Sequence, residues 1–244
     1  MLVSAARSPR APSEDAWRRR DPEIVPVAAS EPAGISQHLN RLRDFSMRLR
    51  FQRNETIFCQ GDAATHVYTM SSGCVRLCRH VPDGRRHIAD FLFAGDIFGL
   101  GESATTALAA EAVGSVTVTA CPRTYFDRLG EGNPRVRSDV LAHLAASLMT
   151  SQEHLFVVSC QSAKERMASF ILRMSERNNL YGDRLDLPMG RQDIADHLGL
   201  TIETICRAIA ALKAETLIEV PNAHQFVIRN LEGLRILAEG RGPK

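Results

Sequence analysis

The segment GLTIETICRAIAALKAE, residues 199–215, has apolar residues at helical spacing and places Glu203, Cys206 and Arg207 together on another face. An arginine can grip guanine O6 and N7 as a fork, and a carboxylate can accept a hydrogen bond from the cytosine N4 amine. Glu203 and Arg207 are four residues apart, so they lie one above the other and can either read bases or form a surface ion pair. The thiol beside them is a group that can be oxidised. The chemistry indicated is base recognition with a redox-active group on the reading face.

The residues around this segment predict the two helices of a helix-turn-helix. RQDIADHLG forms a shorter helix that ends at Gly199, where a left-handed residue can cap it. Thr201 is a suitable N-cap for the second helix, which reads bases with its N-terminal residues. The residues expected to point inward are Ile202, Ile205, Ile209 and Leu212, and those expected to point outward are Glu203, Thr204, Cys206, Arg207 and Ala210 or Ala211. The predicted DNA-binding residues are Arg191, Thr201, Glu203, Thr204, Cys206 and Arg207.

The first half of the chain differs from this segment in its composition and in the spacing of its apolar residues. Residues 1–34 are rich in Pro, Ala and Ser without apolar periodicity and are expected to be a disordered tail. The amphipathic stretch ISQHLNRLRDF that follows is expected to be helical. From Met47 to about Cys121, seven or eight short β-type runs alternate with turn residues such as QGD, SSG and PDG. This pattern predicts an antiparallel β-roll or barrel, and we assign residues 35–132 to it.

A long helix is expected over residues 133–161, with Asn133 as N-cap and Pro134 at the first helical position. Its main apolar seam consists of Leu141, Leu144, Leu148, Leu155 and Val158, with Ser151 at the polar step. The seam can pack on the roll of the same chain or on a second copy. Because Val136 and Val140 provide another stripe for packing within the chain, the interpretation favoured is the seam of a homodimer.

Residues 162–244 read as a second, helix-rich domain. LIEV and QFVIR, separated by PNAH, predict a two-stranded wing after the helix-turn-helix. The fold class predicted is therefore α+β, with an N-terminal β-roll, a long dimerisation helix and a C-terminal winged helix-turn-helix.

The composition of the chain limits the class of protein and the cellular compartment in which we expect it. The chain has 244 residues, of which 44% are hydrophobic, and its net charge of +2 means that any anion-binding surface is local. No membrane span and no signal peptide are expected. Six cysteines include no CxxC pair, and Cys74 and Cys78 lack the second pair of a zinc site, so we expect no metal and a reducing, cytoplasmic location.

At this point the sequence resembles the cyclic-AMP receptor/FNR superfamily of bacterial transcription regulators, over about residues 36–240. The residues that carry the resemblance are Gly61-Asp62, Gly73, AGDIFG at 94–99 and LPMGRQDIADHLGLTIETICR at 187–207. Glu203 and Arg207 match the recognition pair of the FNR branch, which reads TTGA. Cys206 replaces the usual serine, as in the FixK subgroup that regulates microaerobic respiration and nitrogen fixation.

The resemblance implies a homodimeric regulator, an activator, of low-oxygen and nitrogen-fixation genes. It implies a palindromic operator in double-stranded DNA, TTGAT and ATCAA separated by four bases. In helix-turn-helix dimers such as the cyclic-AMP receptor protein the half-sites are about 34–36 Å apart. By the same resemblance, roll loops such as residues 82–86 would contact RNA polymerase.

Departures from the superfamily pattern bear on cofactors, and none is expected here. Cys121 matches the roll cysteine of FNR, but residues 1–58 contain no cysteine, so an iron–sulfur cluster is excluded. Gly101-Glu102 are retained from the cyclic-nucleotide pocket, whereas its arginine is missing and Glu111 is acidic. An anionic nucleotide would meet no counter-charge, so control by cyclic AMP is not expected.

Cys206 is then the candidate for regulation. A position near a helix N-terminus and beside Arg207 favours a reactive thiolate, and its oxidation would place bulk or charge against the DNA. The alternative is a cysteine that only replaces serine and contacts a thymine methyl group.

Two other functions compete with this interpretation. One is an effector-dependent regulator that senses haem or nitric oxide, with His66, His80 and His87 in the roll. The other is a metal oxygenase of cupin type, which needs an HxH motif with a following Glu and a later His. His80 and His87 are seven residues apart and form no such motif, so an enzyme is not expected.

Overall fold

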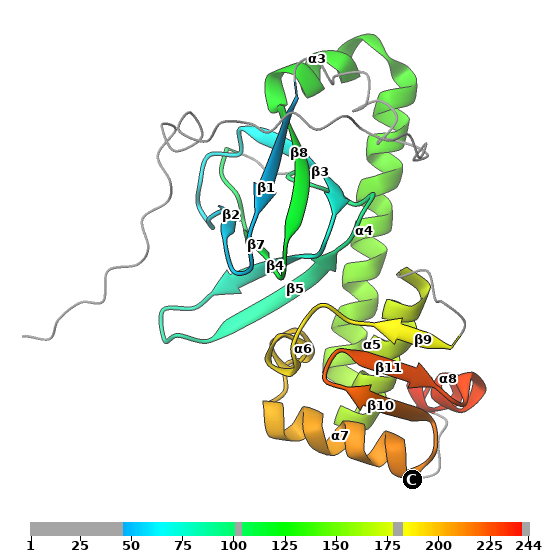
Figure 1. Cartoon of the computed structure of the whole chain (residues 1–244). Helices are drawn as coiled ribbons and strands as arrows, with labels where there is room; N and C mark the ends of the chain where they lie inside the picture. The colour runs from blue at the N-terminus through cyan, green and yellow to red at the C-terminus, as the bar shows by residue number, and fades with distance from the viewer. Residues whose placement is uncertain (1–45, 101–103, 178–182, 241–244) are drawn as a thin grey trace, which may run out of the picture.

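The computed structural model describes residues 46–100, 104–177 and 183–240. The predicted tail at 1–34, the helical stretch at 35–45 and the Gly101-Glu102 pair lie outside the described residues. The chain forms a β-roll, a long helix and a second lobe of helices around a small sheet, in that order (Figure 1). None of the described helices is long and apolar enough to cross a bilayer.

The roll consists of two four-stranded antiparallel sheets, with strand orders β1-β8-β3-β6 and β2-β7-β4-β5. Its strands are β1 Met47–Phe51, β2 Thr56–Phe58, β3 His66–Ser72, β4 Val75–His80, β5 Arg86–Leu92, β6 Ile97–Phe98, β7 Ala109–Ala112 and β8 Val116–Pro122. The predicted β-roll is thus confirmed. β7 has no counterpart in the predicted runs, because AAEA lacks the branched and aromatic residues that mark a strand.

Side chains between the two sheets form the core of the roll. Tyr68 and Phe98 stack there with ring centroids 5.0 Å apart, and Phe58 packs beside them. Ala110 and Ala112 of β7 also face this core. Because side chains alternate along a strand, Glu111 must project from the opposite, outer face of its sheet.

Two helices follow the roll: α3 Arg123–Gly132 and α4 Pro134–Cys160. Asn133 caps α4 by accepting a hydrogen bond from the Arg135 N–H at 3.0 Å, and Pro134 occupies the first position, as predicted. Val136 is fully buried and Val140 packs against a small cluster that includes Phe126. The predicted second stripe therefore holds α4 to its own roll, and α4 runs from there down to the second lobe (Figure 1).

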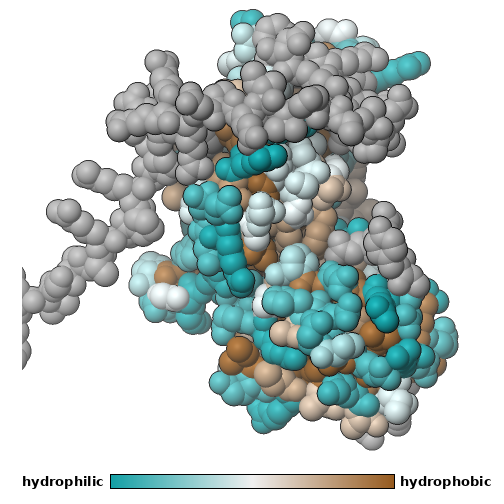
Figure 2. All heavy atoms as spheres, viewed as in Figure 1, coloured by the Kyte–Doolittle hydropathy of each residue, from teal (hydrophilic) through white to brown (hydrophobic). Residues whose placement is uncertain are grey.

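The second lobe contains α5 Ala163–Arg177, β9 Arg184–Asp186, α6 Arg191–Leu198, α7 Ile202–Ala214, β10 Ile218–Asn222, β11 Gln225–Ile228 and α8 Leu231–Ala238. The sheet has three strands in the order β10-β11-β9, so the predicted two-stranded wing was incomplete. β9 is three residues long, too short to show alternation in the sequence. Hydrophilic side chains dominate the viewed surface of this lobe, with hydrophobic ones scattered among them (Figure 2).

The outer face of the β2-β7-β4-β5 sheet contacts the second lobe, and β5 lies against α6. One apolar cluster joins Cys78, Ile88 and Phe91 of the roll to Met167 and Phe170 of α5. The rings of Phe91 and Phe170 meet edge to face, 6.3 Å apart. Residues far apart in the sequence thus share one core between the roll and the helix-turn-helix.

Candidate nucleic-acid interface

The turn between α6 and α7 is fixed by backbone geometry. Gly199 has φ 64° and ψ 37°, the left-handed conformation that ends α6, and this confirms the predicted cap. The Leu200 N–H then donates to the Ala195 carbonyl at 3.0 Å. Arg166 of α5 donates to the Leu198 carbonyl at 2.9 Å, which ties the turn to the helix behind it.

Thr201 begins α7 as the predicted N-cap, and its hydroxyl accepts from the Thr204 N–H at 3.3 Å. The side chains that anchor α7 to the core are Ile205, Ala208, Ile209 and Leu212. The prediction that Ile202 points inward was wrong, since its side chain is 37% exposed. Helical side chains lean toward the N-terminus, so at the first position the side chain extends beyond the packed turn.

The opposite face of α7 is open to solvent and carries Glu203, Cys206 and Arg207, with Thr204 half-buried between them. Arg207 donates to the Thr204 hydroxyl at 3.3 Å, and its side chain is exposed. The pKa of Glu203 is lowered by hydrogen bonds with its own backbone N–H and with Thr201, and to a smaller extent by the charge of Arg207. Glu203 is therefore an ionised hydrogen-bond acceptor on this face.

Thr201 is exposed at the start of the same face, and Arg191 is half-buried at the first position of α6. The structure thus groups five of the six predicted DNA-binding residues on the N-terminal half of α7 and its cap, and places Arg191 at the start of the neighbouring helix.

α4 exposes a row of apolar side chains that its own roll does not cover. Leu141, Leu148 and Leu155, seven residues apart, are 66%, 60% and 65% exposed, and Leu144 and Val158 are half-buried. Met149 and Phe156 are also exposed, at the same seven-residue interval, and sequence reasoning missed them. The repeat of seven was the signal that could have found them.

Two roll residues lie elsewhere than predicted. Within the loop at 82–86, Arg86 turns toward α6 and pairs with Asp196 at 2.7 Å, so it does not belong to an exposed contact surface. Glu111 does not face the roll interior but pairs with Arg76 at 2.7 Å on the outer face. Its charge therefore says nothing about an anionic ligand inside the roll.

The cysteine and histidines considered for cofactors are dispersed. Cys121 is buried, which raises its thiol pKa. His66 is half-buried, with its pKa lowered by that burial, whereas His80 and His87 are exposed on β4 and β5.

Charged pairs join the roll to the helix-turn-helix, and sequence reasoning missed them because the partners are far apart along the chain. Asp193 of α6 accepts from Arg76 at 3.2 Å and from Arg86 at 2.6 Å. On α5, Arg177 pairs with Asp90 at 3.1 Å and with Asp96 of the roll, and Arg173 also contacts Asp90. The Asp193 contacts hold α6, and with it the turn that leads into α7, whereas the other pairs hold α5.

A histidine pair lies behind the same contact. His197 of α6 is buried and its Nδ1–H donates to the Ile88 carbonyl at 2.9 Å. Its ring stacks on that of His154 from α4, with centroids 4.2 Å apart. Burial lowers the pKa of both histidines, that of His154 to about 4, so both rings are neutral at pH 7.

Comparisons with known proteins agree with this geometry. Residues 48–133 match the family model of the cyclic nucleotide-binding domain, and residues 165–237 match that of the Crp-like helix-turn-helix domain. The nitrogen fixation regulation protein FixK of Rhizobium meliloti is 38% identical over 215 residues, which cover 86% of this chain and 98% of that protein. FixK of Azorhizobium caulinodans is 34% identical over 215 residues, which cover 86% of this chain and 86% of that protein.

Among solved structures, FixK2 from Bradyrhizobium japonicum superposes with a TM-score of 0.76 at 33% identity. The match covers 79% of this chain and 96% of that one. These relatives are regulators rather than enzymes. The roll, the helix-turn-helix and the extent of these matches show that the chain belongs to the CRP/FNR family of DNA-binding transcription regulators.

Proposed function

We propose that the chain acts in the cytoplasm as a homodimeric activator of low-oxygen and nitrogen-fixation genes, and that it binds the palindrome TTGAT–four bases–ATCAA. Residues 35–132 would form the roll, 133–161 the dimerisation helix and 162–244 the DNA-binding domain. The observation that carries the proposal is the open face of α7, where Glu203, Cys206 and Arg207 project from a helix anchored by buried side chains. The gene class follows the names of the FixK relatives.

Arg207 reads the guanine of each half-site through two parallel hydrogen bonds, and Glu203 accepts from the amine of a cytosine. The hydrogen bond of Arg207 with the Thr204 hydroxyl is long, at 3.3 Å, and is exchanged for the base on binding. Thr201 and Thr204 flank these two side chains, and Arg191, at the start of α6, contacts the phosphate backbone. Because phosphate contacts position the protein and base contacts specify the sequence, these residues have separable effects.

The exposed row on α4 supplies the second copy's binding surface. Leu141, Leu148 and Leu155 repeat every seven residues, the spacing of a two-stranded seam, with Leu144 and Val158 alongside. A two-fold seam of this kind presents two copies of α7 to a palindrome, so the symmetry of the operator follows from that of the dimer.

Oxidation of Cys206 regulates DNA binding by the exposed face of α7. Its side chain is exposed next to Arg207, where a peroxide can reach it. Oxidation to a sulfinic acid adds two oxygens and a negative charge that faces the phosphates. Binding to the operator then fails while the fold is kept.

The activator role requires contact with RNA polymerase, and the tip of the β4–β5 turn supplies a surface for it. Pro82, Asp83, Gly84 and Arg85 are exposed there. Arg85 pairs with Asp83 at 2.7 Å, which holds the turn in shape.

Fluorescence anisotropy tests the proposal, with the palindrome and a scrambled duplex at one fixed salt concentration. Reduced protein without any added ligand should bind the palindrome selectively, and peroxide should abolish this binding. Cys206→Ser should bind as well as the parent and resist peroxide, with Cys160→Ser as the matched control because Cys160 is the other exposed cysteine among the described residues. Equal binding to both duplexes, or binding only after an effector such as haem is added, would contradict the proposal.

A further inference from the structure

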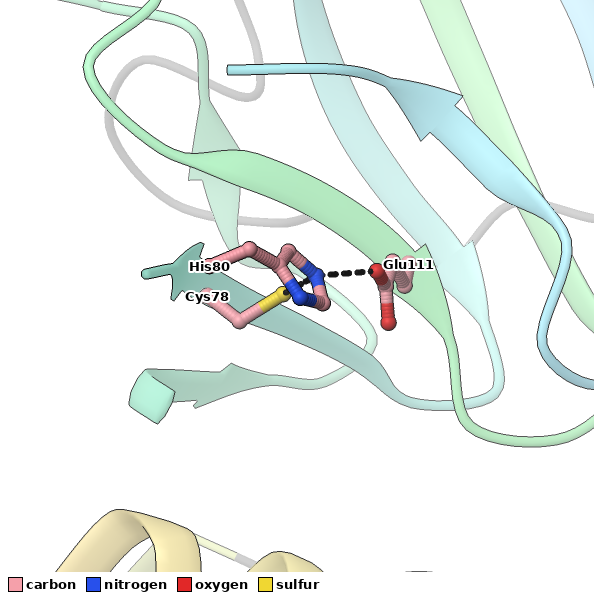
Figure 3. Close-up of side chains that lie close together, drawn as sticks. All are labelled: Cys78, His80 and Glu111. Carbon is pink, nitrogen blue, oxygen red and sulfur yellow. Dashed lines mark hydrogen bonds and ion pairs between the residues drawn. The ribbon is translucent and has the colours of Figure 1, made fainter. Parts of the chain in front are cut away.

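Three potential metal ligands meet on the outer face of the roll (Figure 3). Cys78 and His80 project from the same side of β4, and Glu111 comes from the neighbouring strand β7. The Cys78 Sγ lies 3.6 Å from the His80 Nε2, and that nitrogen lies 2.9 Å from the Glu111 Oε1. The three donor atoms all lie within 4.8 Å of one another. A thiol, an imidazole and a carboxylate are the ligands that zinc uses in proteins.

We propose that Cys78, His80 and Glu111 bind one divalent transition-metal ion of the zinc type, with water at the fourth position. Zinc bonds of about 2.0–2.3 Å in a tetrahedron separate the donor atoms by roughly 3.3–3.7 Å. The sulfur–nitrogen distance of 3.6 Å already fits this geometry. The histidine–carboxylate hydrogen bond at 2.9 Å opens by a few tenths of an ångström when the ion replaces it.

The charges around the three ligands favour a cation. Arg76 and Arg86 are surrounded by three carboxylates, those of Glu111, Asp193 and Asp196, so the group carries one surplus negative charge. The loss of the thiol proton adds a second, which matches a divalent ion. The Arg76 guanidinium occupies Oε2 of Glu111 and leaves Oε1 directed toward His80.

Binding releases a proton. Cys78 is a buried free cysteine, and zinc binds cysteine as the thiolate. The metal–sulfur bond forms as the S–H bond breaks, and the proton leaves to solvent. His80 is 53% exposed and provides the open side through which the ion and its water enter.

The site is connected to the helix-turn-helix through Glu111. The same carboxylate that would bind the metal holds Arg76, and Arg76 holds Asp193 of α6. A metal ion bound to Glu111 neutralises part of its negative charge and so weakens the ion pair between Glu111 and Arg76. The contact of Arg76 with Asp193 of α6 then changes as well. This second part rests on the proposed DNA-binding function, and by reciprocity DNA must then change metal affinity by the same factor.

Titration of the full-length, chelator-treated protein with Co²⁺ alone tests the site, because Co²⁺ replaces colourless zinc and reports tetrahedral thiolate ligation by its absorption bands. A Cys160→Ser/Cys206→Ser background removes the two exposed thiols. We expect one Co²⁺ per chain with a thiolate-to-metal band, displacement by Zn²⁺, and one proton released on binding.

The ligand variants decide the outcome. Cys78→Ser should abolish the thiolate band, and His80→Gln, at an exposed position that leaves the fold intact, should weaken Co²⁺ binding by at least about tenfold, since even outer-shell partners have effects of that size. His87→Gln, an exposed histidine on the adjacent strand β5, is the matched control and should bind as the background does. No thiolate band in the background, or equal affinity in the His80 and His87 variants, would overturn the site.

The connection to α6 is tested separately, by the Kd for the palindrome with and without Zn²⁺. A change in Kd that is absent from His80→Gln supports it. An unchanged Kd overturns the connection between the metal site and α6. If the metal-free protein does not bind the palindrome, the proposed DNA-binding function itself has failed.

Discussion

Arg76 of β4 and Asp193 of α6 form an ion pair at 3.2 Å although 117 residues separate them along the chain. Both side chains are largely buried, with 8% and 12% exposed. Arg86 approaches the same carboxylate at 2.6 Å. One aspartate therefore contacts two arginines of the roll and links them to the helix that precedes the turn into α7.

Replacement of Asp193 by alanine should lower the free energy of unfolding by about 2 kcal/mol, because it removes one buried acceptor from two guanidinium groups whose remaining carboxylate partners are Glu111 and Asp196. Urea denaturation followed by circular dichroism measures this. Asp183→Ala is the matched control: Asp183 pairs with Arg229 at 2.9 Å, but both side chains are nearly half exposed. Its effect should stay within about 1 kcal/mol, and equal losses in the two variants would contradict the interpretation.

Arg207→Ala should weaken binding to the palindrome by about 1–3 kcal/mol and relax selectivity at one base pair of each half-site. Arg191→Ala should instead weaken binding to all duplexes alike and reduce the dependence of binding on salt, as loss of a phosphate contact does. Anisotropy at several salt concentrations, with operators that carry single base changes, separates the two. The same selectivity profile in both variants would mean that one of the two roles is misassigned.

Leu148→Asp should convert the dimer to monomers and abolish binding to the palindrome, since it places a charge in the middle of the exposed seam of α4. Ala146→Asp adds the same charge at an exposed position two residues away, on another face of the helix, and should leave the dimer intact. Sedimentation velocity measures both. A dimer that persists in Leu148→Asp would place the contact between copies elsewhere.

Stability should fall as the pH drops below about 6.5, the ordinary histidine value, before the carboxylates titrate. The pKa of His154 is lowered to about 4 by burial and by Arg173 and His87, against a smaller opposing effect of Asp90 and of a hydrogen bond with His197. The unfolded chain therefore takes up protons first, and the loss of stability continues until the native pKa is reached. The free energy of unfolding at pH 7 and pH 5 shows this fall, and His154→Gln should reduce it. An unchanged difference between the two pH values in that variant would rule out His154 as the cause.

The sequence predicted the features of the fold that depend on residues close together along the chain. The N-caps at Asn133 and Thr201 and the left-handed Gly199 were predictable because each depends on residues within one helical turn. The β-roll followed from the alternation of strands and turns. The recognition pair required a resemblance, because an acid and an arginine four residues apart also describe an ordinary surface ion pair.

Contacts between distant residues were not predictable. Glu111 appeared in the sequence as an isolated acid in an alanine-rich stretch, and only the pairing of β7 with β4 places it beside Arg76, Cys78 and His80. Cys78 and His80 are two residues apart, and any two residues at that spacing lie on the same face of a strand, so the pair alone does not indicate a metal site. Their relation to Glu111 depends on strand order, which no local pattern encodes.

The apolar cluster between roll and helix-turn-helix has a consequence for how the molecule melts. Phe91 of β5 and Phe170 of α5 belong to the same buried cluster, so neither lobe completes its interior alone. Separation of the lobes exposes aromatic and aliphatic surface on both sides, which disfavours a half-unfolded state. We therefore expect the two lobes to lose their structure together on heating, which calorimetry would show as one transition, and a fragment that contains only the helix-turn-helix lacks part of its own interior.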